Sequence, residues 1–354
     1  MKKISSSIKE IIKDAKKGKM FVLVDNKDRE NEGDLVIPAS KVNPKKINFM
    51  AKHGRGLICL ALTSKKVKKL NLPLMSLINK SRTQTAFTIS IESKKGISTG
   101  ISAFDRSKTI KVAIKPSSSK KDIVSPGHVF PLVAKNGGVL ERAGHTEASV
   151  DISKLAKLNP SAVICEVMNE DGTMARYKDL IPFAKKHKLK IAKIEDLISY
   201  RLKNERYIKC ISNKKIKVKK FGNFDLKTFR NKLDGSEHYA VTKGKFYSSK
   251  ASRVRVISTN LLNSFFNFNK DIFKNSLKHL NKFNNFALIL VKGSNPNPAS
   301  SENNRVLRYY GVGAQIIKEL RIKKMILVSR SKKRIIALKG YGIKITKQEI
   351  IKWK

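Results

Sequence analysis

An acidic stretch near the start of the chain, Asp28–Asp34, gathers four carboxylates and one guanidinium within seven residues. Short apolar runs at residues 20–24 and 35–37 flank it, and both predict buried strands. Acids clustered in a loop between two core strands favour a bound cation. Mg²⁺ suits such a loop because it takes one or two carboxylates together with substrate oxygens, and Gly33 allows a tight bend. For the loop taken alone, a solvated and self-neutralised turn is the alternative.

A second group of reactive residues lies between Ser125 and Glu166. Two of the six histidines, His128 and His145, occur in glycine-flanked stretches that read as turns, where a core-packing role is not expected. Arg142 lies close to His145 in the sequence, and Glu166 ends an apolar run that predicts a buried strand. A single histidine is more often structural, but two of them beside an arginine and a glutamate indicate a site.

These residues need a framework of alternating helices and strands. The apolar periodicity predicts helices over 4–18, 42–52, 148–158, 178–187 and 194–201, and strands over 20–24, 35–37, 57–63, 85–91, 162–166 and 189–192. Residues 96–110 are interpreted as a small-residue loop. The alternation predicts a layered α/β domain of about two hundred residues. Because the chain has 354 residues, a second domain is expected after it.

The chain is strongly basic, with 76 lysines and arginines against 27 acids and a formal charge of +49. This charge is typical of proteins that bind nucleic acid or anionic membranes. The lysines, however, are spread along the whole chain, and no basic segment is interleaved with aromatic residues. We therefore expect salt-sensitive, non-specific adhesion to polyanions and no specific nucleic-acid site.

Cysteine usage and hydropathy predict a soluble protein of the cytoplasm. The three cysteines have neither metal-binding spacing nor a secretory framework. The N-terminus has no apolar leader, and no apolar run has the length of a membrane span.

Five motifs resemble, in order and spacing, the 3,4-dihydroxy-2-butanone 4-phosphate synthase family of riboflavin biosynthesis. They are Asp28–Asp34, His53–Cys59, Pro126–Leu132, Glu141–Glu147 and Cys165–Glu166, within a likeness that covers roughly residues 4–202. The resemblance implies conversion of ribulose 5-phosphate into a four-carbon phosphate and formate, with Mg²⁺ or Mn²⁺ and no organic cofactor. It also implies a homodimer with active sites near the subunit interface, and an α/β/α sandwich around a mixed sheet.

The resemblance assigns a role to each matching residue. Glu30 and His145 are expected to bind the metal, and His128 and Glu166 to be essential for catalysis. The residues expected to bind substrate are Arg29, Glu30, Asp34, Arg142, Ala143, Gly144, His145, Thr146 and Glu166, with Glu32 and Cys59 in support. The family usually has an arginine where this chain has Ser125, which puts phosphate or interface contacts in doubt; Lys120, Lys121 and Lys135 are candidates to supply that charge.

The residue types suit a reaction that passes through an enediolate. A divalent ion stabilises the developing oxyanion as a Lewis acid. Histidine, and a glutamate that is partly desolvated, exchange protons near neutral pH. Arginine forks and backbone N–H groups bind a phosphate.

The second half resembles GTP cyclohydrolase II, beyond a lysine-rich connector expected at residues 209–220. The matching stretches are Glu237–Gly244, Ser252–Ile257, Leu307–Leu320, Lys323–Val328 and Gly340–Ile343. The implied organisation is a synthase domain over residues 1–203 and a smaller α+β domain over residues 204–354.

The chemistry of that second family is missing from the sequence. Its three zinc-binding cysteines would fall in Ser258–Phe266, which contains none, and no cysteine follows Cys210. Val306 replaces the family's aspartate, although Arg308 is present, and Ser294–Ser300 replaces its Gly-Arg-Gly loop. We expect an inactive domain without zinc, kept for stability, dimer geometry or partner binding. The alternatives are a bifunctional synthase and cyclohydrolase, or a basic binding protein without catalytic activity.

Overall fold

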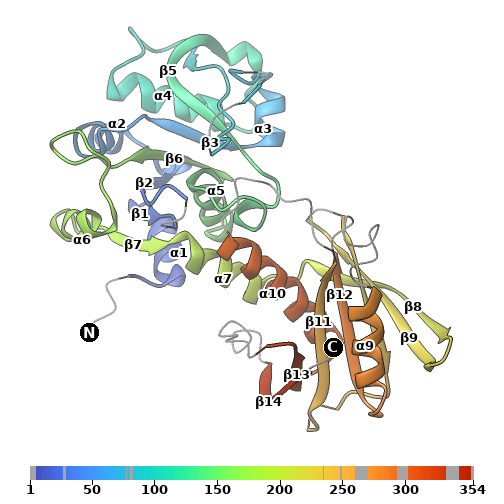
Figure 1. The fold of residues 1–354 in the computed structure, drawn as a ribbon. Coiled ribbons are helices and arrows are strands. Elements are labelled where there is room, and N and C mark those ends of the chain that lie inside the picture. Colours follow the sequence, from blue (N-terminus) through green and yellow to red (C-terminus); the bar gives the residue numbers. More distant parts are fainter. Residues whose placement is uncertain are drawn as a thin grey trace. The chain divides into compact units, whose positions relative to one another are not determined.

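The protein folds into two units, each built on its own sheet (Figure 1). The computed structural model describes residues 5–26, 29–76, 78–79, 83–233, 235–247, 249–259, 270–292, 302–331 and 343–351. The division falls between Tyr200 and Arg201. Each unit contains a seven-stranded mixed sheet with helices packed on it, so the predicted two-part α/β fold is confirmed.

The sheet of the first unit places the ends of several strands beside one another. Its strands are β1 (Phe21–Val24), β2 (Gly33–Pro38), β3 (Cys59–Thr63), β4 (Ile91–Ser93), β5 (Ile123–Ala134), β6 (Ser161–Glu166) and β7 (Lys190–Lys193), in the order β4-β5-β3-β6-β2-β1-β7. The pairs β1–β7 and β3–β5 are parallel, and the others are antiparallel. Strands β1 and β2 are buried along their whole length, as expected for strands with both faces covered.

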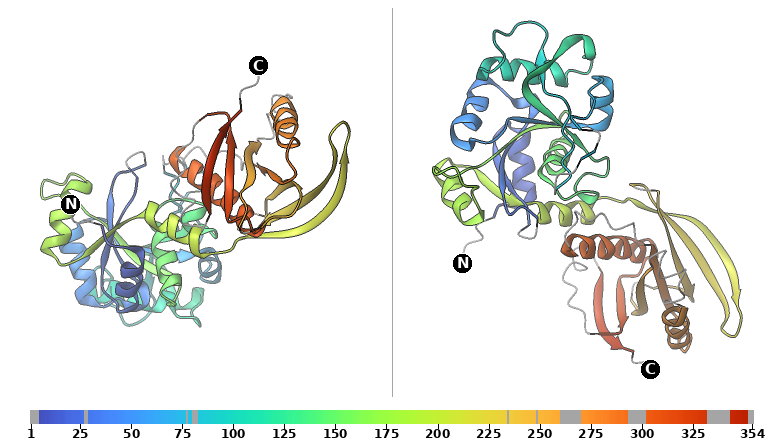
Figure 2. Two further views of the ribbon diagram at one scale, coloured as in Figure 1. Left: turned by 90° about the horizontal axis from the view of Figure 1, so that it is seen from below. Right: turned by 45° about the horizontal axis from the view of Figure 1, so that its top comes forward.

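Helices cover both faces of this sheet. They are α1 (Ile8–Lys16), α2 (Pro44–Phe49), α3 (Ser64–Lys69), α4 (Ala103–Ile114), α5 (His145–Leu155), α6 (Tyr177–Lys186) and α7 (Ile194–Asn204). Helices α1 and α5 are neighbours (Figure 2), and Val150 of α5 packs on Ala61 of β3. On the other face, Ile47, Val67, Ile110 and Leu180 join the core formed by alternate strand residues.

Local sequence signals explain where helices begin, and the structure departs from the predicted helices and loops at three places. Ser7 and Glu10 form a capping box that starts α1. Helix α5 starts at His145 rather than at residue 148, because Gly144 takes an extended conformation there and ends the preceding turn. The expected helix over 42–52 divides into α2 and a π-helical turn, Met50–Gly54, and residues 103–114 form α4 where a loop was expected.

The second unit has the strand order β14-β13-β11-β12-β10-β9-β8. Its strands are β8 (Ile208–Val218), β9 (Gly222–Asn231), β10 (Glu237–Lys243), β11 (Ser252–Thr259), β12 (Phe286–Lys292), β13 (Lys324–Ser329) and β14 (Lys344–Ile350), with helices α9 (Lys270–Leu280) and α10 (Glu302–Glu319). Its core gathers Val241, Leu277, Phe286 and Leu288.

The lysine-rich stretch at residues 209–220 is not the expected connector. Most of it forms β8, which pairs with β9 in the long hairpin drawn in yellow in Figure 2. Strand β8 is the last strand of its sheet, and its lysines are mainly exposed. Lysines on an edge strand discourage pairing with other chains, so this charge run serves a strand rather than a linker.

Candidate metal centre

The acidic loop is folded around Asp25, the residue that follows β1. The Asp25 carboxylate is buried and accepts hydrogen bonds from the backbone N–H groups of Glu30, at 3.1 Å, and Glu32, at 2.9 Å. Asn31 takes the left-handed conformation, with φ of 55°, which asparagine tolerates better than most residues. The loop thereby turns back into β2, whose Gly33 pairs with Val24 of β1. Asp28 lies outside the described residues.

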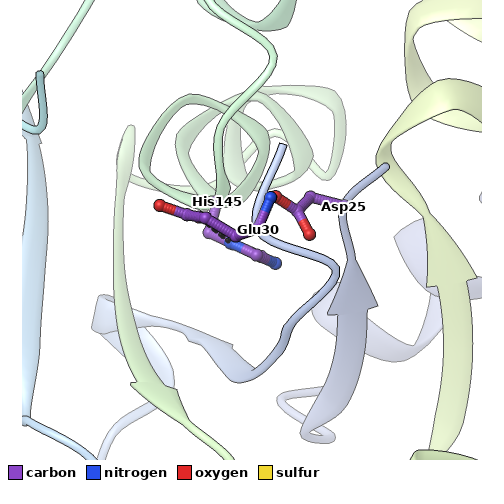
Figure 3. A group of neighbouring side chains, drawn as sticks. All are labelled: Asp25, Glu30 and His145. Atoms are coloured by element: carbon purple, nitrogen blue, oxygen red, sulfur yellow. Dashed lines mark hydrogen bonds and ion pairs between the residues drawn. The ribbon is translucent and has the colours of Figure 1, made fainter. Parts of the chain in front are cut away.

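Asp25, Glu30 and His145 form a group that can hold a metal ion. Their ligand atoms all lie within 4.8 Å of one another, and Figure 3 shows the loop residues meeting the first residue of α5. The Nδ1 atom of His145 lies 3.9 Å from Oε2 of Glu30 and 3.7 Å from Oδ1 of Asp34. Its Nε2 atom is buried and has no hydrogen-bond partner among the residues that the structure describes. A buried ring nitrogen without a partner, next to carboxylates, fits a divalent cation.

Burial keeps the His145 ring neutral. Desolvation, followed by the nearby Arg29 guanidinium, lowers the pKa of His145 to about 3. Neutral imidazole is the form that binds metals, so this ring is ready to act as a ligand at neutral pH.

The carboxylates around the metal group repel one another. Asp34 on β2 and Glu166 on β6 are direct neighbours in the sheet register. Burial, with added repulsion from Glu166 and Glu30, holds the pKa of Asp34 well above its ordinary value. Burial also raises the pKa of Glu166, although Oε2 of Glu166 accepts a 2.9 Å hydrogen bond from the Leu57 N–H. A bound cation would relieve this repulsion.

Two arginines tie the acidic loop, Arg29 from within it and Arg176 from the N-cap of α6. The Nη1 atom of Arg29 lies 2.8 Å from Oδ2 of Asp25 and also contacts Oε2 of Glu30. Burial disfavours the Arg29 charge, but the Glu30 and Asp25 carboxylates outweigh burial and raise the pKa of Arg29. Nη1 of Arg176 donates to the Glu30 carbonyl at 2.5 Å and lies 3.4 Å from Oε1 of Glu32.

The Arg142–Thr146 turn is held by a buried glutamate. Nη1 of Arg142 donates to Oε2 of Glu147 at 2.7 Å, and Nη2 donates to Oγ1 of Thr85 at 2.8 Å. A Cβ atom on Gly144 would lie 2.3 Å from Nη1 of Arg142, so a larger residue there would require the guanidinium to shift. Ala143 is half-buried, and Thr146 is buried in the first turn of α5. The turn thus presents a guanidinium next to the N-terminus of an eleven-residue helix.

Among the expected site residues, His128 stands apart from the metal group, whereas Cys59 lies near the carboxylates of Glu166 and Asp34. His128 lies within β5 rather than in a turn, its side chain is 44% exposed, and Nδ1 contacts Oε1 of Glu92. None of the hydrogen bonds or ion pairs found in the described part of the chain joins His128 to Asp25, Glu30 or His145. Cys59 begins β3 and is buried, and burial raises the pKa of its thiol well above the ordinary value. Cys59 is therefore a neutral thiol and no thiolate ligand.

Sequence reasoning missed Asp25. It lies outside the seven-residue acidic stretch and has no acidic neighbour, so it did not stand out. Its position was the available signal, because the first polar residue after a buried strand lies at a sheet edge where sites form.

Comparison with known proteins gives a match over each unit. Residues 9–200 match the sequence profile of 3,4-dihydroxy-2-butanone 4-phosphate synthase, and residues 209–283 and 274–349 match that of GTP cyclohydrolase II. The chain is 44% identical to a 3,4-dihydroxy-2-butanone 4-phosphate synthase of Photobacterium phosphoreum, covering 96% of this chain and 98% of the relative. It is 43% identical to the riboflavin biosynthesis protein RibBA of Aquifex aeolicus (strain VF5), covering 98% of this chain and 92% of the relative.

Two solved structures resemble the chain to different extents. RibBX, a two-domain 3,4-dihydroxy-2-butanone 4-phosphate synthase from A. baumannii, has a TM-score of 0.85 at 40% identity and covers 98% of this chain and 100% of its own. A 3,4-dihydroxy-2-butanone 4-phosphate synthase in complex with two magnesium ions has a TM-score of 0.54 at 37% identity, covering 56% of this chain and 98% of its own. In the described part of this chain, none of the helices has the length and apolar character to cross a membrane.

Proposed function

This chain belongs to the 3,4-dihydroxy-2-butanone 4-phosphate synthase family, and we propose that its first unit carries out that reaction with a divalent metal ion. The enzyme is a lyase of riboflavin biosynthesis that converts ribulose 5-phosphate into 3,4-dihydroxy-2-butanone 4-phosphate and formate. We assign Mg²⁺ or Mn²⁺ to Glu30 and His145, with Asp25 holding the loop around them. The observation that carries this assignment is the meeting of Asp25, Glu30 and His145 within 4.8 Å.

The side chains around the metal group suit the proton transfers that the reaction needs. When bound, a divalent ion stabilises the negative charge that develops on vicinal sugar oxygens. Glu166 has a pKa raised by burial and is held by the Leu57 N–H, so it is a suitable group to take and return protons. Each correctly placed acid or base contributes about a hundred- to ten-thousand-fold in rate.

The phosphate of the substrate would bind beside the start of α5. Arg142 and the N–H groups of the first turn supply a guanidinium and a helix N-terminus, two groups that recognise phosphate. Arg142 packs directly against Gly144, so a larger residue at position 144 would displace the guanidinium. Arg29 and Asp34 complete the proposed substrate-binding set, with Glu32 and Cys59 in support.

His128 enters this proposal through the homodimer. Its ring is partly exposed on β5 and is not joined to the metal group by any contact in the described residues. A second copy of the chain, with the active site near the subunit interface, offers a way for His128 to take part. The cytoplasmic location and the adhesion to polyanions stay predictions.

For the second unit we propose a fold retained without cyclohydrolase activity. No cysteine follows Cys210, so three thiolates for zinc cannot be assembled there. Residues 260–266 and 294–300, which replace the metal and loop segments, lie outside the described residues. Val306 and Arg308 lie on α10, where side chains are not described. The bifunctional alternative has the RibBA relative in its favour, since this chain matches both profiles.

The proposed reaction is tested by turnover of ribulose 5-phosphate with and without EDTA. We expect chelation to abolish formate release and added Mg²⁺ to restore it. Glu30→Ala and His145→Ala should each lower turnover by at least about a hundredfold, whereas Glu170→Gln, at a side chain that is 91% exposed, should leave it unchanged. Activity that survives chelation, or either alanine variant, would rule out these ligands.

A further inference from the structure

His128 is paired with a glutamate that the sequence did not single out. Oε1 of Glu92, on β4, contacts Nδ1 of His128, on β5. The Glu92 side chain is only 16% exposed, while the His128 ring is 44% exposed. The carboxylate is therefore largely enclosed, and the imidazole reaches from it toward the surface.

An irregularity in the sheet brings the two side chains together. Strands β4 and β5 are antiparallel, but Ile91 pairs with Val129 and the next residue, Glu92, pairs with Val124. Residues 125–128 of β5 consequently have no partner on β4 and bulge out of the ladder. Bulges redirect side chains and are common next to active sites. Here the bulge carries His128 to Glu92.

Two glycines pack the main chain against the pair. A Cβ atom on Gly100 would lie 1.7 Å from Oε1 of Glu92 and 2.8 Å from Nδ1 of His128. A Cβ atom on Gly127 would lie 2.3 Å from Cγ of Glu92. The Ile91 backbone, 2.2 Å from such an atom on Gly127, leaves no room for another residue there, and Gly100 has a φ of 89°, which other residues rarely adopt. An incidental ion pair on a protein surface is not enclosed in this way and contributes little to stability.

The glycine at position 100 is itself held in place by a buried aspartate. Its N–H group donates to Oδ2 of Asp105 at 3.1 Å, and the Ser98 hydroxyl donates to the same oxygen at 2.8 Å. Asp105 stands in the first turn of α4, whose N-cap is Ser102. The loop over Glu92 is thus anchored to a helix, so the pair is a built feature of the fold.

We propose that Glu92 is a positioning residue that acts through His128 in the reaction assigned to the first unit. Because Nδ1 faces the carboxylate, that nitrogen carries the proton and donates it to Glu92. The lone pair of Nε2, on the side of the ring away from Glu92, can then accept a proton from bound substrate. A carboxylate behind a histidine fixes the tautomer, orients the ring and stabilises the imidazolium that forms. This inference rests on the proposed function, which makes His128 essential.

The tautomer of His128 can be measured in the full-length protein without any turnover. In ¹⁵N-labelled protein, long-range ¹H–¹⁵N NMR spectra should show His128 protonated on Nδ1 and unprotonated on Nε2. Assignment uses the signals that disappear in His128→Ala. In Glu92→Gln the amide can donate to Nδ1, so the proton should move to Nε2 in a large fraction of molecules. A wild-type ring protonated on Nε2 would overturn the inference even if Glu92→Gln failed to fold.

Kinetics then separate positioning from a merely structural role. We expect Glu92→Gln to lower kcat about a hundredfold with KM changed less than about threefold, by analogy with the loss of a carboxylate behind a histidine. Combining Glu92→Gln with His128→Ala should cost no more than His128→Ala alone, because Glu92 has no other route to the reaction. Glu170→Gln is the matched control at an exposed glutamate.

The outcomes distinguish this inference from the proposed function. If the losses of kcat multiplied in the double variant, only the role of Glu92 would be overturned. The same would hold if Glu92→Gln left the enzyme unchanged while His128→Ala impaired it. A His128→Ala enzyme with full activity would contradict the proposed role of His128, and the role of Glu92 would fall with it.

Discussion

The two units have the same kind of framework and differ in what their charged side chains do. Each has a seven-stranded mixed sheet and its own apolar core. In the first unit, Asp25, Asp34 and His145 are buried together at the ends of strands and at the start of α5. Within the described residues, the acids and histidines of the second unit form no comparable group. In general, an activity depends on the donor atoms placed on a fold rather than on the fold alone.

The electrostatics of the two units differ in the same way. Burial and like charges raise the pKa of Asp34 in the first unit. In the second unit, Glu349 accepts two hydrogen bonds from Arg253, at 3.0 and 2.9 Å, and these outweigh burial and lower the pKa of Glu349. The first unit tolerates unfavourable charge at a site, whereas the second unit uses a charge pair to hold two strands together.

The largest expected effect is that of removing the proposed base. We expect Glu166→Gln to lower the turnover of ribulose 5-phosphate by about a hundred- to ten-thousand-fold, because the amide cannot take up a proton. Glu237→Gln, at an exposed glutamate of the second unit, is the matched change and should leave turnover unaltered. If both variants lost activity equally, the contrast between the units would be wrong.

Asp25→Asn tests how much the metal centre depends on its loop. The variant replaces a carboxylate that accepts hydrogen bonds from two backbone N–H groups and from the Arg29 guanidinium. We expect Mg²⁺ affinity to fall about ten- to a hundredfold, as is common when a group that orients a metal ligand is changed. Isothermal titration calorimetry measures the affinity. Binding equal to that of the wild type would show that the loop keeps its shape without this charge.

The sign of a carboxylate's contribution to stability should differ between the units. Since the folded state raises the pKa of Asp34, folded protein binds more protons than unfolded protein above about pH 4, and stability falls as pH rises. In metal-free protein, Asp34→Asn should therefore raise the free energy of unfolding at pH 8 by on the order of 1 kcal/mol, and by less at pH 4.

Glu349→Gln provides the opposite case. The folded state lowers the pKa of Glu349, so its contribution is present above about pH 4.5 and is lost as pH falls through the folded pKa. The glutamine variant should be less stable than wild type at pH 8, with a smaller difference near pH 3. Urea unfolding at several pH values measures the stability of both variants. If both substitutions changed the free energy of unfolding in the same direction at pH 8, the contrast between the units would be wrong.

The smallest expected effect is that of zinc on the second unit. Because no three-thiolate site can form, purified full-length protein should contain no stoichiometric zinc, and added Zn²⁺ should not release formate from GTP. Elemental analysis and a formate assay check this. Zinc bound at one ion per chain, with GTP turnover, would make the second unit an enzyme after all.

The sequence predicted the strands that carry the site better than the segments around them. Apolar runs at residues 20–24, 35–37 and 162–166 correspond to β1, β2 and β6. Helix α4 was missed because serines and glycines precede it, although Ser102 and Asp105 are an N-cap and a first-turn acid. Strand β8 was missed because its lysines conceal the alternation of Ile208, Ile216 and Val218.

The site shows the same limit. Motifs located Glu30 and His145, which the fold brings together from positions far apart in the chain. Asp25 and Glu92 were not located, because Asp25 holds the backbone of its own loop and Glu92 contacts a histidine on another strand, and no motif spacing encodes either arrangement. A carboxylate that supports another side chain can be recognised only when the position of that side chain in the fold is known.

The separate cores described for the two units have an evolutionary consequence. The residues assigned to the metal centre lie between Asp25 and Glu166, entirely before the division at residue 200. Substitutions that erase a reaction in the later half can therefore accumulate while the sheet around Leu288 continues to be selected for folding. A gene of this kind can lose one ancestral activity by gradual drift and still encode a chain that makes the other product.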